Sequence, residues 1–200
     1  MKKTIANRSH RLSVRKNVVP CQPLKRVNYF TGQLLLANDF TAEQDYHLEK
    51  HRRHNRLCHG FGVVQGLKVS VANNTAGPTV IVDPGFAFDP SGNEIQLCSQ
   101  VRLQLRELQT PIYVLIRFAE NPTDPVPTIP APTGGEDGGV EYARVEEGCE
   151  VLLDPNASLP DTGSNPQGKR CSPAALPLAR LVRKGKAWQM DRKFKTARAH

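Results

Sequence analysis

The periodicity of the sequence changes at Gly60, and this change constrains the fold more than any other feature. No proline or glycine interrupts residues 38–59, and Gly60 suits the position just after a helix. Asn38, Asp39 and Thr41 are all plausible N-caps, and Thr41 with Gln44 three places later makes a capping box. We therefore predict one principal helix over about residues 40–58.

After Gly60 the apolar residues alternate with polar ones, which is the period of a strand. FGVVQGLKVSV predicts a strand at about residues 62–72, TVIVDPG predicts a second, and FAFDPSGNEIQL predicts a hairpin that turns at residues 90–93. VRLQLREL, PIYVLIRFAE, residues 140–153, LPLARLVRK and KAWQMD supply the other strands. The predicted fold class is α+β, mainly antiparallel β, as a sandwich or barrel-like body of about eight strands with one helix and an extended N-terminal arm.

Two stretches rich in proline and glycine separate the later strands. Residues 120–139 contain five prolines and four glycines, and residues 154–172 carry more of both. Each stretch exceeds the usual connection length, so we predict long surface loops there. The predicted organisation is a basic arm at 1–26 and a single β-rich domain at 27–200.

Nearly all of the excess charge lies in the arm. The chain has a formal net charge of +8. The arm holds eight basic residues and no acid: Lys2, Lys3, Arg8, Arg11, Arg15, Lys16, Lys25 and Arg26. The rest of the chain is neutral, which is not the charge pattern of a folded nucleic-acid-binding face. The arm fits a tail that docks on something acidic, whether a protein groove, a membrane surface or nucleic acid.

The cysteines and the hydropathy limit the cellular setting. Five cysteines are scattered without a C-x-x-C spacing, so we expect reduced thiols in a cytoplasmic protein. No apolar run approaches the roughly 20 residues of a membrane span. The first residues lack the apolar segment of a secretory signal.

The stretch HLEKHRRHNRLCH raises the question of a metal site. On a helix, His47, His51, His54 and Cys58 share one face, but they climb three turns, about 16 Å. That distance is too long for one ion, so at most two or three of them could join ligands from elsewhere. We expect instead a buried or half-buried face on which the imidazoles and Asn55 hydrogen-bond to neighbouring backbone. His54, Asn55 and Arg56 would then fix how the helix meets the sheet. A surface used by a partner is the other alternative. No metal and no cofactor are predicted.

Catalytic motifs are absent from the sequence. The glycines of HGFGVVQGL follow a helix and open a strand, the reverse of a phosphate-binding loop. Gly60 as a helix stop, with Gly62 or Gly66 at close-packed positions, explains them better. There is no G-x-S-x-G and no matched acid–base pair. We therefore predict no enzyme activity, no catalytic residues and no small-molecule substrate.

Residues 27–69 contain a more specific pattern: Y-F-x-G-Q-L-L, then D-F, E-Q-x-Y, H-N-R and G-x-G-V-V-x-G-L. Its main positions are Tyr29, Phe30, Gly32, Asp39, Phe40, Tyr46, His54, Asn55, Arg56, Gly60, Gly62 and Gly66. This pattern resembles a signature of uncharacterised proteins encoded with phage-tail-like contractile injection systems. VDPGFAFDPSGNEI is similar to an element of tail-fibre and baseplate proteins, and the resemblance covers about residues 27–118 and 139–191.

The resemblance implies a structural place in a tail-like particle, at or near its baseplate, spike or fibres. We expect the subunit to act by symmetric assembly and by docking its basic arm on neighbouring subunits. Its implied partners are baseplate, spike or fibre proteins and further copies of the chain, with a trimer as the first expectation and a pentamer or hexamer as alternatives. The subunit would assemble in the cytoplasm into a particle that is membrane-anchored or released. The alternative function is a carbohydrate- or envelope-binding module that uses the two long loops.

Overall fold

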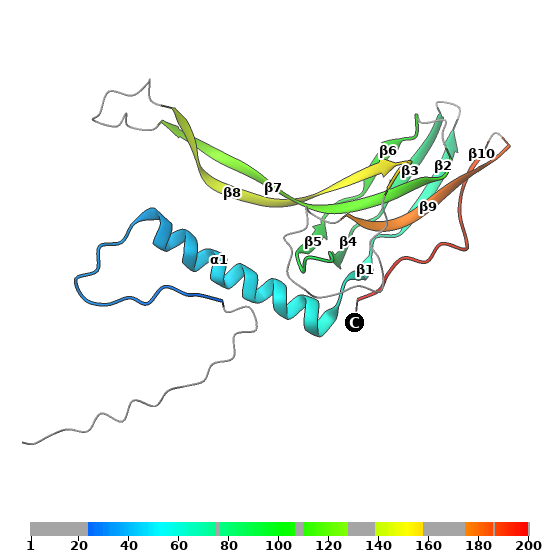
Figure 1. The fold of residues 1–200 in the computed structure, drawn as a ribbon. Helices are drawn as coiled ribbons and strands as arrows, with labels where there is room; N and C mark the ends of the chain where they lie inside the picture. Colours follow the sequence, from blue (N-terminus) through cyan, green and yellow to red (C-terminus); the bar gives the residue numbers. More distant parts are fainter. Residues whose placement is uncertain are drawn as a thin grey trace, which may run out of the picture. The chain divides into compact units, whose positions relative to one another are not determined.

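The computed structural model describes residues 24–74, 77–106, 110–127, 139–157, 175–185 and 187–199. The chain divides into two compact units, Met1–Tyr46 and His47–His200, and each is considered by itself. The described elements are α1 (Ala37–His54), a π-helical turn η1 (Asn55–His59), β1 (Gly62–Gly66), β2 (Val69–Asn74), β3 (Gly77–Val82), β4 (Gly85–Phe88), β5 (Glu94–Leu97), β6 (Val101–Gln104), β7 (Ile112–Pro127), β8 (Val140–Asp154), β9 (Leu176–Lys184) and β10 (Ala187–Met190) (Figure 1).

The start of α1 differs from the prediction. The helix begins at Ala37, and the backbone N–H of Leu36 donates to a carboxylate oxygen of Asp39 at 2.9 Å. An acidic residue three places into a helix can satisfy the N–H that precedes it and favours the positive end of the helix dipole. Thr41 lies inside the helix, where its hydroxyl donates to the carbonyl of Ala37 at 3.1 Å. The predicted capping box of Thr41 and Gln44 is therefore wrong.

The end of the helix agrees with the prediction. After His54 the chain widens into η1, and Gly60 follows it with φ of 71°. A positive φ reverses the chain most easily at glycine, so Gly60 ends the helix as expected. Within the described part of the chain, no helix is long and apolar enough to cross a membrane.

The strands form three antiparallel sheets, with strand orders β1-β4-β5, β2-β3-β6 and β10-β9-β7-β8. This arrangement confirms the α+β class with mainly antiparallel β structure. The described strands number ten, against about eight predicted, and their sheets do not close into a barrel. The hairpin between β4 and β5 turns where the sequence predicts, and its two strands pair from Gly85↔Leu97 to Phe88↔Glu94.

The predicted strand at 62–72 is split between two sheets. β1 pairs with β4, whereas β2 pairs with β3. Gly66 and Leu67 have φ of 63° and 50°, and two consecutive left-handed residues turn the chain out of its first sheet. Leu67 is only 4% exposed, so burial of its side chain offsets the unfavourable backbone conformation.

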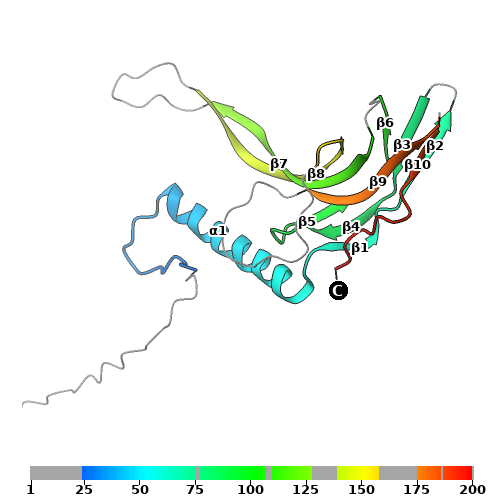
Figure 2. The same ribbon diagram turned by 45° about the vertical axis from the view of Figure 1, so that its right-hand side comes forward.

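The predicted loop at 120–139 is shorter than its composition indicates. β7 continues to Pro127 and pairs with β8 in one constant register, from Tyr113↔Asp154 to Pro127↔Val140, with only the pair at Asp124 missing. Prolines usually exclude a segment from the middle of a sheet. Among the described strands, none other than β8 pairs with the outer part of β7, because β9 pairs with β7 only from Ile112 to Ile116 (Figure 2). Residues 128–138 and 158–174, the rest of the two predicted loops, lie outside the described residues.

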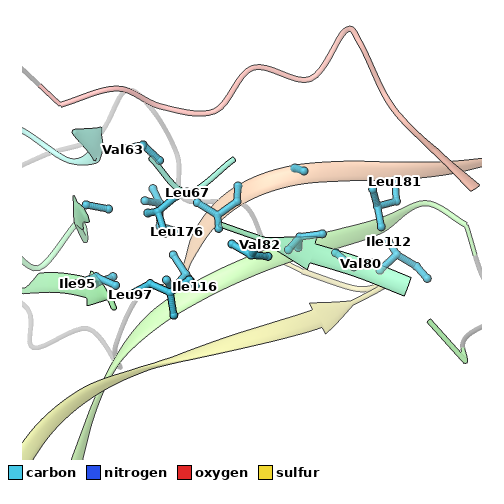
Figure 3. Packing of buried hydrophobic residues seen from close by; sticks show 14 of the residues in the cluster. Val63, Leu67, Val80, Val82, Ile95, Leu97, Ile112, Ile116, Leu176 and Leu181 are labelled. Atoms are coloured by element: carbon cyan, nitrogen blue, oxygen red, sulfur yellow. The ribbon is translucent and has the colours of Figure 1, made fainter. Parts of the chain in front are cut away.

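The hydrophobic core lies where the three sheets meet (Figure 3). Its fully buried members come from all of them: Val80, Val82, Ile95, Ile112, Val114, Ile116, Leu176 and Leu181. Burial of each such side chain contributes about 1.5–3 kcal/mol. The core therefore fixes the body of the second unit, from which the hairpins and the β7–β8 ribbon extend.

Candidate assembly surfaces

Within the second unit, the end of the helix is bound to the turn between β4 and β5 by three polar side chains. Arg52 donates through Nε to the side-chain oxygen of Asn93 at 2.5 Å. Asn55 donates to the carbonyl of Gly92 at 3.0 Å, and Arg56 donates to the carbonyl of Ser91 at 2.6 Å. We call this set of contacts the helix–hairpin junction. Asn55 is 5% exposed, so its bond to Gly92 is sheltered from water.

Two residues of the turn allow the close approach. A Cβ atom added to Gly92 would lie 2.2 Å from the carbonyl oxygen of Arg52, and its φ is +87°. Asp89 is fully buried and accepts hydrogen bonds from the backbone N–H and the side-chain amide of Asn93, at 2.8 and 2.7 Å. Burial raises the pKa of Asp89, although the bonds from Asn93 oppose this shift.

The prediction for the packing face of the helix is wrong for the histidines and Cys58, and confirmed for Asn55 and Arg56, which bond to the hairpin backbone. His47, His51, His54 and Cys58 are all exposed, and the arginine side of the helix meets the hairpin instead. The hairpin turn presents the carbonyl oxygens of Ser91 and Gly92, which accept from the Arg56 guanidinium and the Asn55 amide. His51 Nδ1 lies 3.8 Å from the carboxylate of Glu94, and the ring of His54 packs edge-on to His59 with centroids 5.4 Å apart.

Gly62 and Gly66 of the sequence signature are close-packed positions, as predicted. A Cβ on Gly62 would lie 2.6 Å from the backbone of Ala197, and one on Gly66 would lie 2.1 Å from the carbonyl of Pro84. Val63 beside them donates its N–H to Ala197 at 2.9 Å, so the C-terminal segment lies along β1. These glycines therefore serve the packing of the body.

The first unit exposes large apolar side chains. The segment before α1 turns at Gly32, which has φ of 86°, and the Tyr29 hydroxyl donates to the Glu43 carboxylate, which raises the pKa of Tyr29. Around this turn and on the first turns of the helix, several side chains remain uncovered: Tyr29 47%, Phe30 65%, Leu34 81%, Leu36 60% and Phe40 52%. Such a density of exposed apolar residues marks an interaction surface. We call it the leader surface.

Other residues of the helix region and of the arm differ in how far they are exposed. Tyr46 is half-buried, and Leu57 in η1 is 66% exposed. Of the arm, Lys25 and Arg26 are exposed, whereas Lys2, Lys3, Arg8, Arg11, Arg15 and Lys16 lie outside the described residues.

The sequence predicts β8 and the part of β7 as far as residue 120, but it missed the outer part of β7, residues 121–127, and with it the ribbon that these two strands form. Its outer part, residues 119–127 and 140–148, carries five carboxylates and one guanidinium: Glu120, Asp124, Glu141, Arg144, Glu146 and Glu147. It also exposes Val126 43%, Val140 63%, Tyr142 57% and Val145 61%. The signal in the sequence was the alternation of VEYARVEE opposite PTDPVP, which the prolines obscured.

The described residues contain no metal-binding cluster. No group of three or more His, Cys, Asp or Glu side chains in them could hold a metal ion. Cys58, Cys98 and Cys149 are free. Burial raises the pKa of Cys149, whose thiol donates to the carbonyl of Gln96 at 3.4 Å, so this thiol is a weaker nucleophile than an exposed one.

Comparison with known proteins gives structural neighbours only. No family model matches the sequence, and no curated protein matches it. The crystal structure of TssK is similar with a TM-score of 0.50 at 12% identity, over 84% of this chain and 41% of that chain.

Two further similar structures come from type VI secretion. A chain of the TssK-TssF-TssG baseplate subcomplex has a TM-score of 0.47 at 13% identity, over 87% of this chain and 62% of that chain. A chain of the type VI baseplate complex has 0.48 at 12%, over 87% and 60%. The chain thus spans less than two thirds of each of these neighbours. At such low identity the comparison with TssK establishes likeness of fold, and it does so for part of TssK.

Proposed function

We propose that the chain is a structural subunit of a contractile injection system, at or near its baseplate, that acts by symmetric assembly. The observation that carries this proposal is the leader surface, because a monomer would leave its side chains in water. The sequence signature at 27–69 and the fold shared with part of TssK support the baseplate position, since TssK is described within a TssK-TssF-TssG baseplate subcomplex.

The leader surface favours a homo-oligomer. Full burial of one Phe or Leu side chain contributes about 1.5–3 kcal/mol, so the five large side chains of the leader surface are enough to favour association. The partners we propose are further copies of the chain, with a trimer expected first, and baseplate, spike or fibre proteins of the particle. Assembly would take place in the cytoplasm. The proposed role requires no catalysis.

The test is the mass of the full chain in native buffer, with and without changes to the leader surface. Phe30→Ser, Leu34→Ser and Phe40→Ser together should convert the oligomer to a monomer. Val64→Ser with Met190→Ser is the control, because these residues are 44% and 40% exposed on the β-body, and it should stay oligomeric. A wild-type chain that remains monomeric at tens of micromolar would reject symmetric assembly.

Position in the particle needs a second measurement. The wild-type chain should co-sediment with sheath, tube and baseplate proteins from cells that express the whole system, and the triple variant should be lost from that fraction. A chain that is oligomeric but never sediments with particles would reject the baseplate role and leave the oligomer in place.

A further inference from the structure

The outer edge of β8 is open and long. β8 is the last strand of the sheet β10-β9-β7-β8, and from Val140 to Glu147 it pairs, among the described strands, with β7 only. The ribbon extends eleven residues beyond the last β7–β9 pair, roughly 35 Å at strand spacing. A two-stranded ribbon is marginal by itself in water, and an open edge accepts a further strand.

The two edges of the ribbon differ in their ability to accept a strand. Outer β7 contains Pro122, Pro125 and Pro127, which lack the N–H that an added strand needs as a donor. β8 has no proline from Val140 to Asp154. A third strand therefore fits on the β8 edge rather than on the β7 edge.

The charge of the β8 edge specifies the partner. Arg144 lies 3.3 Å from Asp124, and Glu120 lies 3.5 Å from Arg52, so these groups have partners. The three carboxylates of outer β8, Glu141, Glu146 and Glu147, are exposed and form no ion pair within the described residues. Glu147 also stands directly opposite Glu120, an unfavourable like-charge pair that a nearby cation would relieve.

We propose that the β8 edge binds the basic arm, residues 1–26, of a second copy of this chain as an added strand. The arm carries eight cations and no acid, while the body is neutral, so the chain itself contains the complementary segment. This inference rests on the proposed symmetric assembly and names one contact within it.

The arm sequence fits one antiparallel register. Arg11 and Lys16 are five residues apart, as are Glu141 and Glu146, and Leu12 alternates with its polar neighbours as a strand requires. The register pairs Glu141 with Lys16, Tyr142 with Arg15, Val145 with Leu12 and Glu146 with Arg11. Opposite charges and a cation over an aromatic ring are favourable cross-strand pairs.

Photo-crosslinking of the full chain tests the contact. A photo-reactive phenylalanine analogue replaces Tyr142, and copies grown in ¹⁴N and ¹⁵N media are mixed before irradiation. We expect cross-linked peptides that join β8 to the segment around Arg15 and that carry mixed isotopes. The control places the same analogue at Met190, on the opposite edge strand β10, and should give no link to the arm. Links only within one copy, or links to other segments, would overturn the proposal.

Charge exchange tests the register. Arg11→Glu alone and Glu146→Arg alone should each lower the yield of the mixed-isotope link about tenfold, since each replaces an attraction by a repulsion. The two changes together should restore the yield, and failure of restoration in folded protein would overturn the register. Native mass and co-sedimentation distinguish failure of this contact from failure of the proposed function. An oligomer with no arm–ribbon link rejects this contact alone. A linked oligomer that never joins particles rejects the baseplate role alone.

Discussion

Gly92 at the helix–hairpin junction allows a quantitative test of how the helix is attached. An alanine there would adopt φ near +87°, which costs a residue with a Cβ about 1–2 kcal/mol. Its Cβ would also lie 2.2 Å from the carbonyl oxygen of Arg52, so the helix end must move away by nearly an ångström. That movement lengthens the buried bond from Asn55, whose loss costs about 1–3 kcal/mol. We expect Gly92→Ala to lower the free energy of unfolding by about 2–5 kcal/mol.

Urea unfolding followed by Trp188 fluorescence measures this loss, because Trp188 is the single tryptophan and is 5% exposed. With a slope of about 2 kcal/mol/M, the midpoint should fall by roughly 2 M. Gly185→Ala is the matched control, since its φ is +62° and nothing lies within 4 Å of its added Cβ. It should cost only about 1 kcal/mol. Equal losses in the two variants would refute the close approach of the helix to Gly92.

Three other changes test the junction and the histidines. Asn55→Leu leaves the Gly92 carbonyl without its donor and should lower the free energy of unfolding by about 1–3 kcal/mol in the same urea assay. Burial raises the pKa of Asp89, so the folded state holds the Asp89 proton more tightly than the unfolded state does. The free energy of unfolding should therefore fall as pH rises from the ordinary pKa of Asp through the raised pKa of Asp89, and then level off. Asp89→Asn should flatten this slope in urea midpoints between pH 3.5 and 6, and should lose one of the two bonds to Asn93. A chelator should leave the melting temperature unchanged, because the imidazoles and thiol of residues 47–59 span about 16 Å, and a drop of several degrees would contradict this.

Local signals predicted the local features of the fold. Gly60 ends the helix, and the turn at residues 90–93 joins β4 to β5, because the residue types at each place favour one backbone conformation. The start of the helix was misplaced because Asp39 and Thr41 both fit a capping pattern, and only the contact to Leu36 decides between them. Competing caps of similar strength cannot be ranked from sequence.

The sequence could not predict the helix–hairpin junction, because this junction is formed by contacts between residues that are far apart in the chain. Helical period shows that four residues share a face, but not which face packs. The packing face is set by carbonyls of Ser91 and Gly92, which lie more than thirty residues later in the chain. The ribbon was missed for a related reason, because its prolines oppose a strand locally while fourteen register pairs with β8 hold it. The sequence likewise could not predict that the residues of the leader surface are exposed, because exposure depends on how the whole chain folds.

The constant register of β7 and β8 has a mechanical consequence. Hydrogen bonds between antiparallel strands run across the strand direction. A force that pulls the two strands apart at the end near Pro127 therefore loads one residue pair at a time and separates the strands progressively. A force along the strands loads all fourteen register pairs together, so the same ribbon resists shear far better than it resists peeling. Any attachment to β8 that pulls parallel to its length would use the stronger direction.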